Sequence, residues 1–158
     1  MTRRAIGYVA AIGALAGLAG GLAEVIWICT YAAVTNSDAG LVARAVTDTF
    51  RFGNQHVSPI VSGVGIHLGL AAILGITVAI AIRPILGFLH GIDLYGSITA
   101  ALAVVWAVNF FVVLPFVNPR FVYIVPYEVS LLSKLLFGVA AAGLFQLAQL
   151  ARPNLFHA

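Results

Sequence analysis

The chain has 158 residues, of which 62% are hydrophobic and only 8% are charged, and its mean hydropathy is +1.08. Soluble domains contain about 45–50% apolar and about 25% charged residues, so this composition leaves too few charges to cover a soluble globule. The formal net charge of +3 comes from basic residues that are scattered singly apart from Arg3 and Arg4, which excludes a basic surface for nucleic acid. At this length we expect one integral membrane domain, residues 1–158, whose main partner is the lipid bilayer.

Four apolar stretches are each long enough for the roughly 20 residues that a helix needs to cross a bilayer core. They cover about residues 5–34, 59–82, 95–115 and 127–150. Since short segments connect them, the pattern predicts an all-α fold, a four-helix transmembrane bundle with up-down topology. The first stretch follows two arginines, as a secretory signal would, but its apolar run is about twice as long as a signal core. We therefore expect a retained helix.

The connection between the first two spans is predicted to hold a short interfacial helix at about residues 38–52. Residues 35–38 supply N-cap side chains, apolar residues recur after them at helical spacing, and Arg44, Asp48 and Arg51 share the opposite face. Such a helix would lie in the membrane interface with its apolar side toward lipid. The alternative is a loop helix that packs on the ends of the bundle.

The connection between the last two spans contains Pro115, Pro119 and Pro126. Because proline blocks the continuation of a helix, we expect the third span to end at Pro115 and a turn to lie against the membrane surface. The alternative is a segment that dips into the membrane under the cover of other parts of the protein.

Small residues recur at four-residue spacing in three of the spans. They are Gly13, Gly17 and Gly21 in the first span, Gly65 and Gly69 in the second, and Gly138 and Ala142 in the fourth. Such stripes let helix backbones approach closely where lipid removes the hydrophobic drive for association. We favour packing within the chain over packing against a second copy in a homo-oligomer.

Basic residues near the span ends favour one orientation in the membrane. With the N-terminus in the cytoplasm, the cytoplasmic ends carry Arg3, Arg4, Arg83 and Arg152, and the outer ends carry Arg44, Arg51 and Arg120. This excess predicts that the N-terminus and the C-terminus are both cytoplasmic.

Each span also carries one polar side chain inside its apolar stretch: Glu24, His67, Asn109 and Lys134. An ionisable residue inside a membrane helix costs about 2.5–3.5 kcal/mol by insertion scales unless it is paired or hydrated. At a rise of ~1.5 Å per residue, all four residues lie roughly 9–15 Å below the same membrane surface, so we expect them to converge in one polar cluster.

Two interpretations of this cluster are open. In the structural one, Glu24 and Lys134 form an ion pair, and His67 and Asn109 supply hydrogen bonds that fix the order of the helices. In the functional one, the cluster is a site for a proton, an ion or a small polar molecule, because carboxylate and imidazole can exchange protons near neutral pH and intramembrane ionisable groups often mark transport or relay paths.

Other chemistries find less support in the sequence. The single cysteine, Cys29, excludes an intrachain disulfide and a thiolate metal site. A haem between helices would typically need two facing ligands, and only His67 lies well inside a span. Glu24 with His67 is too small a set for a metal site, and the chain shows no nucleophile triad or phosphate loop. We therefore expect no enzyme activity and no cofactor.

The order of these features resembles the YagU-like small bacterial inner-membrane proteins. The matching segments are residues 13–27 (GALAGLAGGLAEVIW), residues 64–67 (VGIH), residues 109–115 (NFFVVLP) and the pair Ser133-Lys134. The resemblance covers most of the chain and implies a location in the bacterial inner membrane without a defined activity. This chain has Asn109 and Lys134 where the family pattern has histidines, so the resemblance does not imply histidine-based chemistry here.

Two classes of function remain. In the first, the chain is a small polytopic membrane protein whose polar cluster binds or passes a proton or a small solute. In the second, it is a non-catalytic accessory subunit of a larger membrane protein complex, since its loops are short and its small-residue stripes offer surfaces for other membrane subunits.

Overall fold

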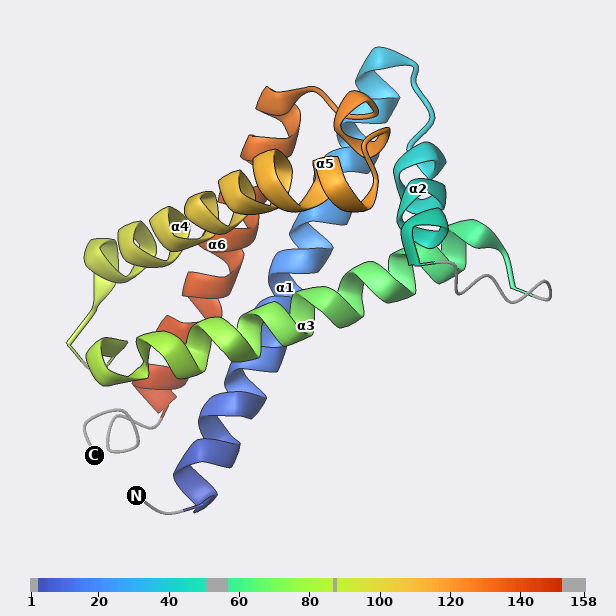
Figure 1. Cartoon of the computed structure of the whole chain (residues 1–158). Helices are drawn as coiled ribbons and strands as arrows, with labels where there is room; N and C mark the ends of the chain where they lie inside the picture. Colours follow the sequence, from blue (N-terminus) through green and yellow to red (C-terminus); the bar gives the residue numbers. More distant parts are fainter. Residues whose placement is uncertain (1–2, 51–56, 87, 152–158) are drawn as a thin grey trace.

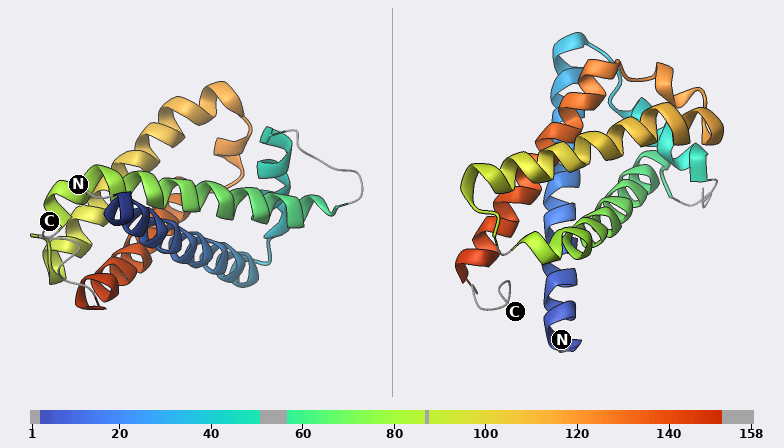
Figure 2. Two further views of the ribbon diagram at one scale, coloured as in Figure 1. Left: turned by 90° about the horizontal axis from the view of Figure 1, so that it is seen from below. Right: turned by 60° about the vertical axis from the view of Figure 1, so that its left-hand side comes forward.

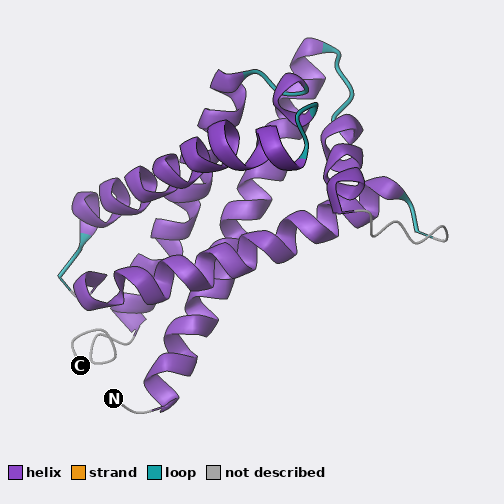
Figure 3. Ribbon diagram, in the orientation of Figure 1, coloured by secondary structure: helices purple, strands orange, loops and turns teal. Residues whose placement is uncertain are grey.

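A computed structural model describes residues 3–50, 57–86 and 88–151 of the chain. Within these residues every regular element is a helix, and short loops join the helices (Figure 3). Four helices are long and apolar enough to cross a membrane: Ile6–Thr35, Pro59–Leu86, Gly91–Val117 and Tyr127–Ala151. The all-α architecture with four long apolar helices is thereby confirmed.

The second span is longer than its sequence pattern predicts. Helix α3 (Pro59–Leu86) continues through Pro84, whereas the apolar run predicts an end near residue 82. Proline is tolerated in membrane helices when neighbouring groups satisfy the backbone. Separately from the proline, the Gln149 amide donates hydrogen bonds to the carbonyl oxygens of Leu86, at 2.6 Å, and Leu89, at 3.2 Å, which satisfies acceptors at the end of the helix and in the loop after it.

The third span differs from its prediction at both ends. Helix α4 (Gly91–Val108) begins four residues before residue 95, and it continues directly into a π-helical turn, η1 (Asn109–Val113), and a short helix, α5 (Leu114–Val117). The expectation that the helix ends at Pro115 is therefore wrong. In a regular α-helix the ring of Pro115 would clash with the carbonyl four residues back. The wider turn, in which the Leu114 amide bonds the Asn109 carbonyl, lies directly before it.

Helix α1 (Arg3–Thr35) lies at the centre of the arrangement. It packs against α3 on one side and against α6 (Tyr127–Ala151) on the other, and α4 packs on α6. Figures 1 and 2 show that α3 crosses α1 obliquely, and that the beginning of α1, the end of α6 and the α3–α4 connection lie at one end of the molecule. The four spans alternate in direction, as predicted.

Glycine allows the close crossing of α1 and α3. A Cβ atom on Gly17 would overlap the carbonyl oxygen of Ala71, and one on Gly75 would overlap the carbonyl oxygen of Gly13. The backbones of the two helices are therefore in direct contact. This confirms that the stripe in the first span packs within the chain.

The stripes in the other two spans have different outcomes. Gly138 of α6 lies against Thr99 of α4, where a Cβ would approach the Thr99 Cα to 2.8 Å, so this stripe also packs. Gly65 and Gly69 face open space, since a Cβ added at either residue would have no described atom of another element within 4 Å. The preference for packing within the chain is therefore wrong for these two glycines, and packing against a second copy stays a prediction. The packed face of α3 is instead the row at residues 63, 67, 71, 75 and 79, which lies on the opposite side of the helix.

The predicted helix in the first connection is present as α2 (Gly40–Phe50). The end of the predicted interval, residues 51–52, which includes Arg51, lies outside the described residues. Helix α2 packs on the beginning of α3: the Thr47 hydroxyl donates a 2.6 Å hydrogen bond to the Pro59 carbonyl, and a Cβ on Gly63 would overlap the backbone of Ala43. Helix α2 thus packs on the bundle, as expected for the alternative of a loop helix that packs on the bundle ends. Its place at the membrane interface stays a prediction.

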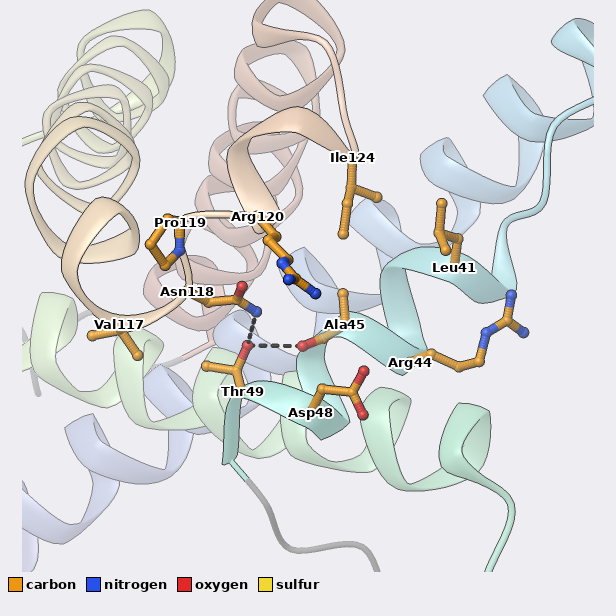
Figure 4. Close-up of a pocket in the computed structure, with 10 residues that line it drawn as sticks. All are labelled: Leu41, Arg44, Ala45, Asp48, Thr49, Val117, Asn118, Pro119, Arg120 and Ile124. Atoms are coloured by element: carbon orange, nitrogen blue, oxygen red, sulfur yellow. Dashed lines mark hydrogen bonds between the residues drawn. The ribbon is translucent and has the colours of Figure 1, made fainter.

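The third connection folds back over α2. After α5, a 3₁₀ turn, η2 (Phe121–Tyr123), leads to Pro126 and the beginning of α6. The Asn118 amide donates a 2.7 Å hydrogen bond to the Thr49 hydroxyl, so this segment is attached to α2 (Figure 4). The bond joins the two connections at the same end of the bundle.

Candidate functional site

A buried carboxylate lies at the centre of the candidate site. The Glu24 side chain, on α1, is only 7% exposed, and the Lys134 ammonium of α6 approaches its Oε1 atom to 2.7 Å. The Ser133 hydroxyl donates a 3.3 Å hydrogen bond to the same oxygen. Because a charge is costly inside a membrane unless it is paired, this ion pair accounts for the presence of both residues within the spans.

The second oxygen of the carboxylate faces a histidine. His67 Nε2, on α3, lies 3.5 Å from Glu24 Oε2. That distance is an electrostatic contact without a hydrogen bond, and neither atom has a hydrogen-bond partner among the described residues although both atoms are buried. The Oε1 atom of Glu24 therefore has an ion-pair partner and a hydrogen-bond donor, whereas its Oε2 atom has only the electrostatic contact with His67.

Two glycines bring the neighbouring helices to Glu24. A Cβ on Gly20 would overlap the ring of Phe137 in α6, and a Cβ on Gly21 would lie 2.7 Å from the Ala71 side chain in α3. The Lys134 ammonium also lies 4.8 Å from the centre of the Phe137 ring, within the range of a cation–π contact. The pair Gly20-Gly21, one turn before the carboxylate, thus lets α3 and α6 close around it.

The fourth predicted residue has a different position. Asn109 begins the η1 turn, its side chain is exposed, and it lines the same cavity as the other three without a hydrogen bond to them. Trp106, one turn earlier, donates a 3.0 Å hydrogen bond to the Ser130 hydroxyl and so attaches this part of the third span to α6. The structure therefore brings Glu24, His67 and Lys134 into contact and places Asn109 on the wall beside them.

A cavity of about 290 Å³ adjoins the cluster. We call it the cluster cavity. All four predicted residues line it. The rest of its wall comes from α1, α2, α3, α4, η1, α5, α6 and the segment before α6. This wall is mostly apolar, and its lining residues include Val25, Ile28, Cys29, Val42, Val46, Ile60, Val64, Trp106, Phe110, Leu114, Phe121 and Val125. The cluster cavity thus has a mostly apolar wall that also includes the ion pair of Glu24 and Lys134.

Three polar residues that line the cluster cavity were not predicted as site residues from the sequence: Trp106, Ser130 and Ser133. Trp106 precedes Asn109 by three residues, which places the two on one helix face, and Ser133 directly precedes Lys134 in the sequence. These spacings were the available signal. Small hydroxyl residues are common inside membrane helices, however, and only the positions of the other helices single out these two serines.

The cluster offers few metal ligands. Throughout residues 3–50, 57–86 and 88–151, no three histidine, cysteine or acidic side chains lie close enough together to hold a metal ion. The polar groups that line the cluster cavity are instead a carboxylate, an imidazole, an ammonium, hydroxyls, the Asn109 amide and the Trp106 indole, which bind hydrogen-bonding or charged solutes.

Fold and site together define a small polytopic membrane protein whose helices enclose a charged cluster beside an apolar cavity. No protein-family model, no curated protein and no solved structure matches the chain.

Proposed function

We propose that the chain is a non-enzymatic protein of the bacterial inner membrane whose cluster cavity binds or passes a proton or a small polar solute. Glu24 and His67 are the groups that take up this species, and Lys134 holds Glu24 in place. Both termini lie in the cytoplasm, in keeping with the larger number of arginines at that end of the spans. The resemblance to YagU-like proteins supports the inner-membrane location.

One observation carries the proposal. Glu24 Oε2 and His67 Nε2 are buried, lie 3.5 Å apart beside a cavity and lack hydrogen-bond partners among the described residues. A purely structural ion pair would be expected to satisfy both carboxylate oxygens, because an unsatisfied buried polar group costs about 1–3 kcal/mol. An incompletely satisfied carboxylate next to an imidazole is an arrangement suited to accepting a proton or a hydrogen-bond donor.

The size and lining of the cavity limit the solute. Ligand pockets for drug-sized molecules measure about 300–1,000 Å³, so a volume of about 290 Å³ suits a small molecule. The wall includes Trp106 and Phe110, and the polar groups lie together near Glu24. We therefore propose a small solute with one polar or cationic group and a short apolar part, or a proton alone.

The test compares wild type with variants that remove the charges in pairs. Glu24→Gln/Lys134→Met removes both members of the ion pair, which avoids leaving one charge buried alone. Glu128→Gln is the matched control, because Glu128 is an exposed carboxylate in the first turn of α6 and does not line the cluster cavity. Proton flux is measured in proteoliposomes with an internal pH dye under an imposed potassium diffusion potential. Retained small molecules are measured by mass analysis of the detergent-purified protein.

The wild type and Glu128→Gln should show either proton flux or a retained small molecule, and the double variant should show neither. Alkylation of Cys29, which is the chain's single cysteine and lines the cluster cavity, should also inhibit the wild type and leave Cys29→Ala active. Absence of both signals in wild type, or equal signals in the double variant, would contradict the proposal. Co-purification of large membrane subunits with those negative results would favour the accessory-subunit hypothesis.

Orientation has its own test. In a Cys29→Ala background, cysteine at Tyr123 should react with an impermeant thiol reagent in intact cells, and cysteine at Ile92 should not. Both residues are exposed; Tyr123 belongs to η2 and Ile92 to the first turn of α4. The segment after α5 and the beginning of α4 lie at opposite ends of the bundle (Figure 1). The reverse labelling pattern would show that the termini lie outside.

A further inference from the structure

A second cavity, of about 600 Å³, lies between α2 and the segment from α5 to η2 (Figure 4). We call it the end cavity, because it lies where two connections between spans meet. Its lining combines the charged residues Arg44, Asp48 and Arg120 with apolar residues that include Leu41 and Ile124. It is separate from the cluster cavity, and the two share no lining residue.

One of the three charges already has a partner. Arg44 forms an ion pair with Asp38 in the turn before α2, and its hydrogen bond to that carboxylate holds the pKa of Asp38 below its usual range. Figure 4 shows the Arg44 guanidinium at the far end of α2, directed away from Arg120. The side chains of Asp48 and Arg120 form no ion pair or hydrogen bond with another described residue. One anionic group and one cationic group thus remain in the end cavity.

The walls of the end cavity are tied together. The Asn118 amide donates to the Thr49 hydroxyl at 2.7 Å, and that hydroxyl donates to the Ala45 carbonyl at 2.7 Å. In Figure 4 this chain of bonds lies between Arg120 on one side and Asp48 on the other. Asp48 and Arg120 therefore belong to two segments that are hydrogen-bonded to each other, but the two side chains form no ion pair with each other.

We infer that the end cavity binds the headgroup of a zwitterionic phospholipid of the phosphatidylethanolamine type, with its phosphate on Arg120 and its ammonium on Asp48. A free cation and a free anion in one cavity complement a ligand that carries both charges and no net charge. Arginine binds phosphate oxygens through several N–H groups, and a carboxylate accepts from an ammonium.

The position of the cavity favours a lipid over a soluble zwitterion. Segments that join membrane spans lie at the level of the lipid headgroups, and both walls of the end cavity belong to such segments. Leu41 and Val117, which line it, are 47% and 58% exposed, so apolar surface is available for the glycerol and acyl part of the same molecule. This inference does not depend on the function proposed for the cluster cavity.

The experiment titrates the detergent-purified full chain with phosphatidylethanolamine and phosphatidylglycerol of identical short acyl chains and counts bound lipids by native mass spectrometry. Wild type should bind phosphatidylethanolamine more tightly than phosphatidylglycerol, which lacks the ammonium. Arg120→Gln should weaken the binding of both lipids about threefold to tenfold, the range expected for partly exposed charge-assisted contacts. Asp48→Asn should weaken only phosphatidylethanolamine and so remove the preference.

Glu128→Gln serves as control for the loss of an exposed carboxylate at the same end of the molecule and should bind as wild type does. Elution of each variant as a single folded species on size exclusion shows that lost binding is not lost folding, because both substituted residues are exposed. Tighter binding of phosphatidylglycerol, or an unchanged preference in Asp48→Asn, would overturn the inference. Displacement of the lipid by an equimolar amount of free phosphoethanolamine would also overturn it, since the occupant would then be a soluble molecule.

Discussion

The two ends of the bundle are built differently. At the end that holds the α3–α4 connection, which we call the closed end, Leu86, Leu94 and Ile98 are fully buried, and the Gln149 amide binds the carbonyls that terminate α3. At the opposite end, which we call the open end, α2 and the α5–η2 segment connect the spans (Figure 1). Residues of both segments line the end cavity and the cluster cavity. The closed end is packed around apolar side chains, whereas the open end holds both cavities and the Glu24–Lys134 ion pair.

The row of residues on the packed face of α3 shows why the two ends differ. Ala79, Gly75 and Ala71 are small, and along them α3 touches α1. The next residue in the row is His67, whose side chain cannot fit a backbone contact, and the one after that is Gly63, which touches α2 instead. The partner of α3 therefore changes at His67, and the space left by this change is where the Glu24 carboxylate and the cluster cavity lie. Residue size along one face decides where helices touch and where a polar site has room.

The largest expected effect is on the contact that defines the packed part of the molecule. Gly17→Leu places a branched side chain where a single Cβ would already overlap the Ala71 carbonyl oxygen. The atom that it meets is backbone and cannot rotate away, so we expect a cost above the usual roughly 1–3 kcal/mol for overpacking and loss of the folded protein in mild detergent. Size exclusion and thermal unfolding measure this loss.

Gly69→Leu is the matched control in α3. No described atom of another element lies within 4 Å of a Cβ at that position, so the variant should unfold within about 0.5 kcal/mol of wild type, as surface substitutions usually do. Normal stability of Gly17→Leu, or equal losses in the two variants, would show that the glycine crossing does not determine the fold.

The fold was largely predictable from the sequence because apolar runs of about 20 residues have few other uses. The meeting of Glu24, His67 and Lys134 was also predictable, since a fixed rise per residue places them at one depth. The rotation of each helix was not. Gly65 and Gly69 satisfy the four-residue spacing as well as Gly75 does, and only the position of α1 decides which face of α3 packs.

Features that depend on tertiary contacts were beyond the sequence pattern. The passage of the third span through Pro115 depends on a π-helical turn, which no local spacing signals. The end cavity depends on the hydrogen bond between Asn118 and Thr49, residues 69 positions apart. Asn109 lines the same cavity as the three charged residues, as their shared level predicts, but it begins the π-helical turn and makes no hydrogen bond to them.

The second expected effect concerns the ion pair at the open end. Glu24→Gln leaves the Lys134 ammonium without its 2.7 Å partner, and Lys134→Met leaves the buried carboxylate without its lysine, beside only the Ser133 hydroxyl and the His67 ring. Breaking a buried pair typically costs about 3–5 kcal/mol, whereas replacing both members by apolar or neutral groups can be nearly neutral. Each single variant should therefore lose much of its free energy of unfolding, and Glu24→Gln/Lys134→Met should recover most of it. Reversible unfolding in mixed detergent measures the free energy of unfolding of wild type, of the two single variants and of the double variant.

The partial exposure of the Lys134 side chain, 18%, lowers the expected cost toward the smaller figure, since water at the cavity screens the ammonium better than it screens the 7% exposed Glu24. Glu24→Gln should accordingly be the milder of the two changes. Strictly additive losses in the double variant would mean that the two charges do not interact. Full recovery of stability together with loss of proton flux or of the retained solute would separate the structural from the functional role of the pair.

The smallest expected effect comes from side-chain hydrogen bonds, compared between the two ends. Gln149→Leu removes the two bonds to the Leu86 and Leu89 carbonyls, and a buried acceptor left without a partner costs about 1–3 kcal/mol. The Oε1 atom of Gln149 is itself buried without a partner among the described residues, and its removal offsets part of that cost, so about 1–2 kcal/mol is expected. Asn118→Ala at the open end removes a bond that is only partly buried, and Thr49 keeps its bond to Ala45, so about 0.5–1 kcal/mol is expected.

Hydrogen exchange locates each effect: the amides of Phe88 and Leu89 should exchange faster in Gln149→Leu, and those of α2 should exchange faster in Asn118→Ala. A greater loss of stability in Asn118→Ala than in Gln149→Leu would show that the α2 contact, and not the packed α3–α4 end, is the stronger of the two.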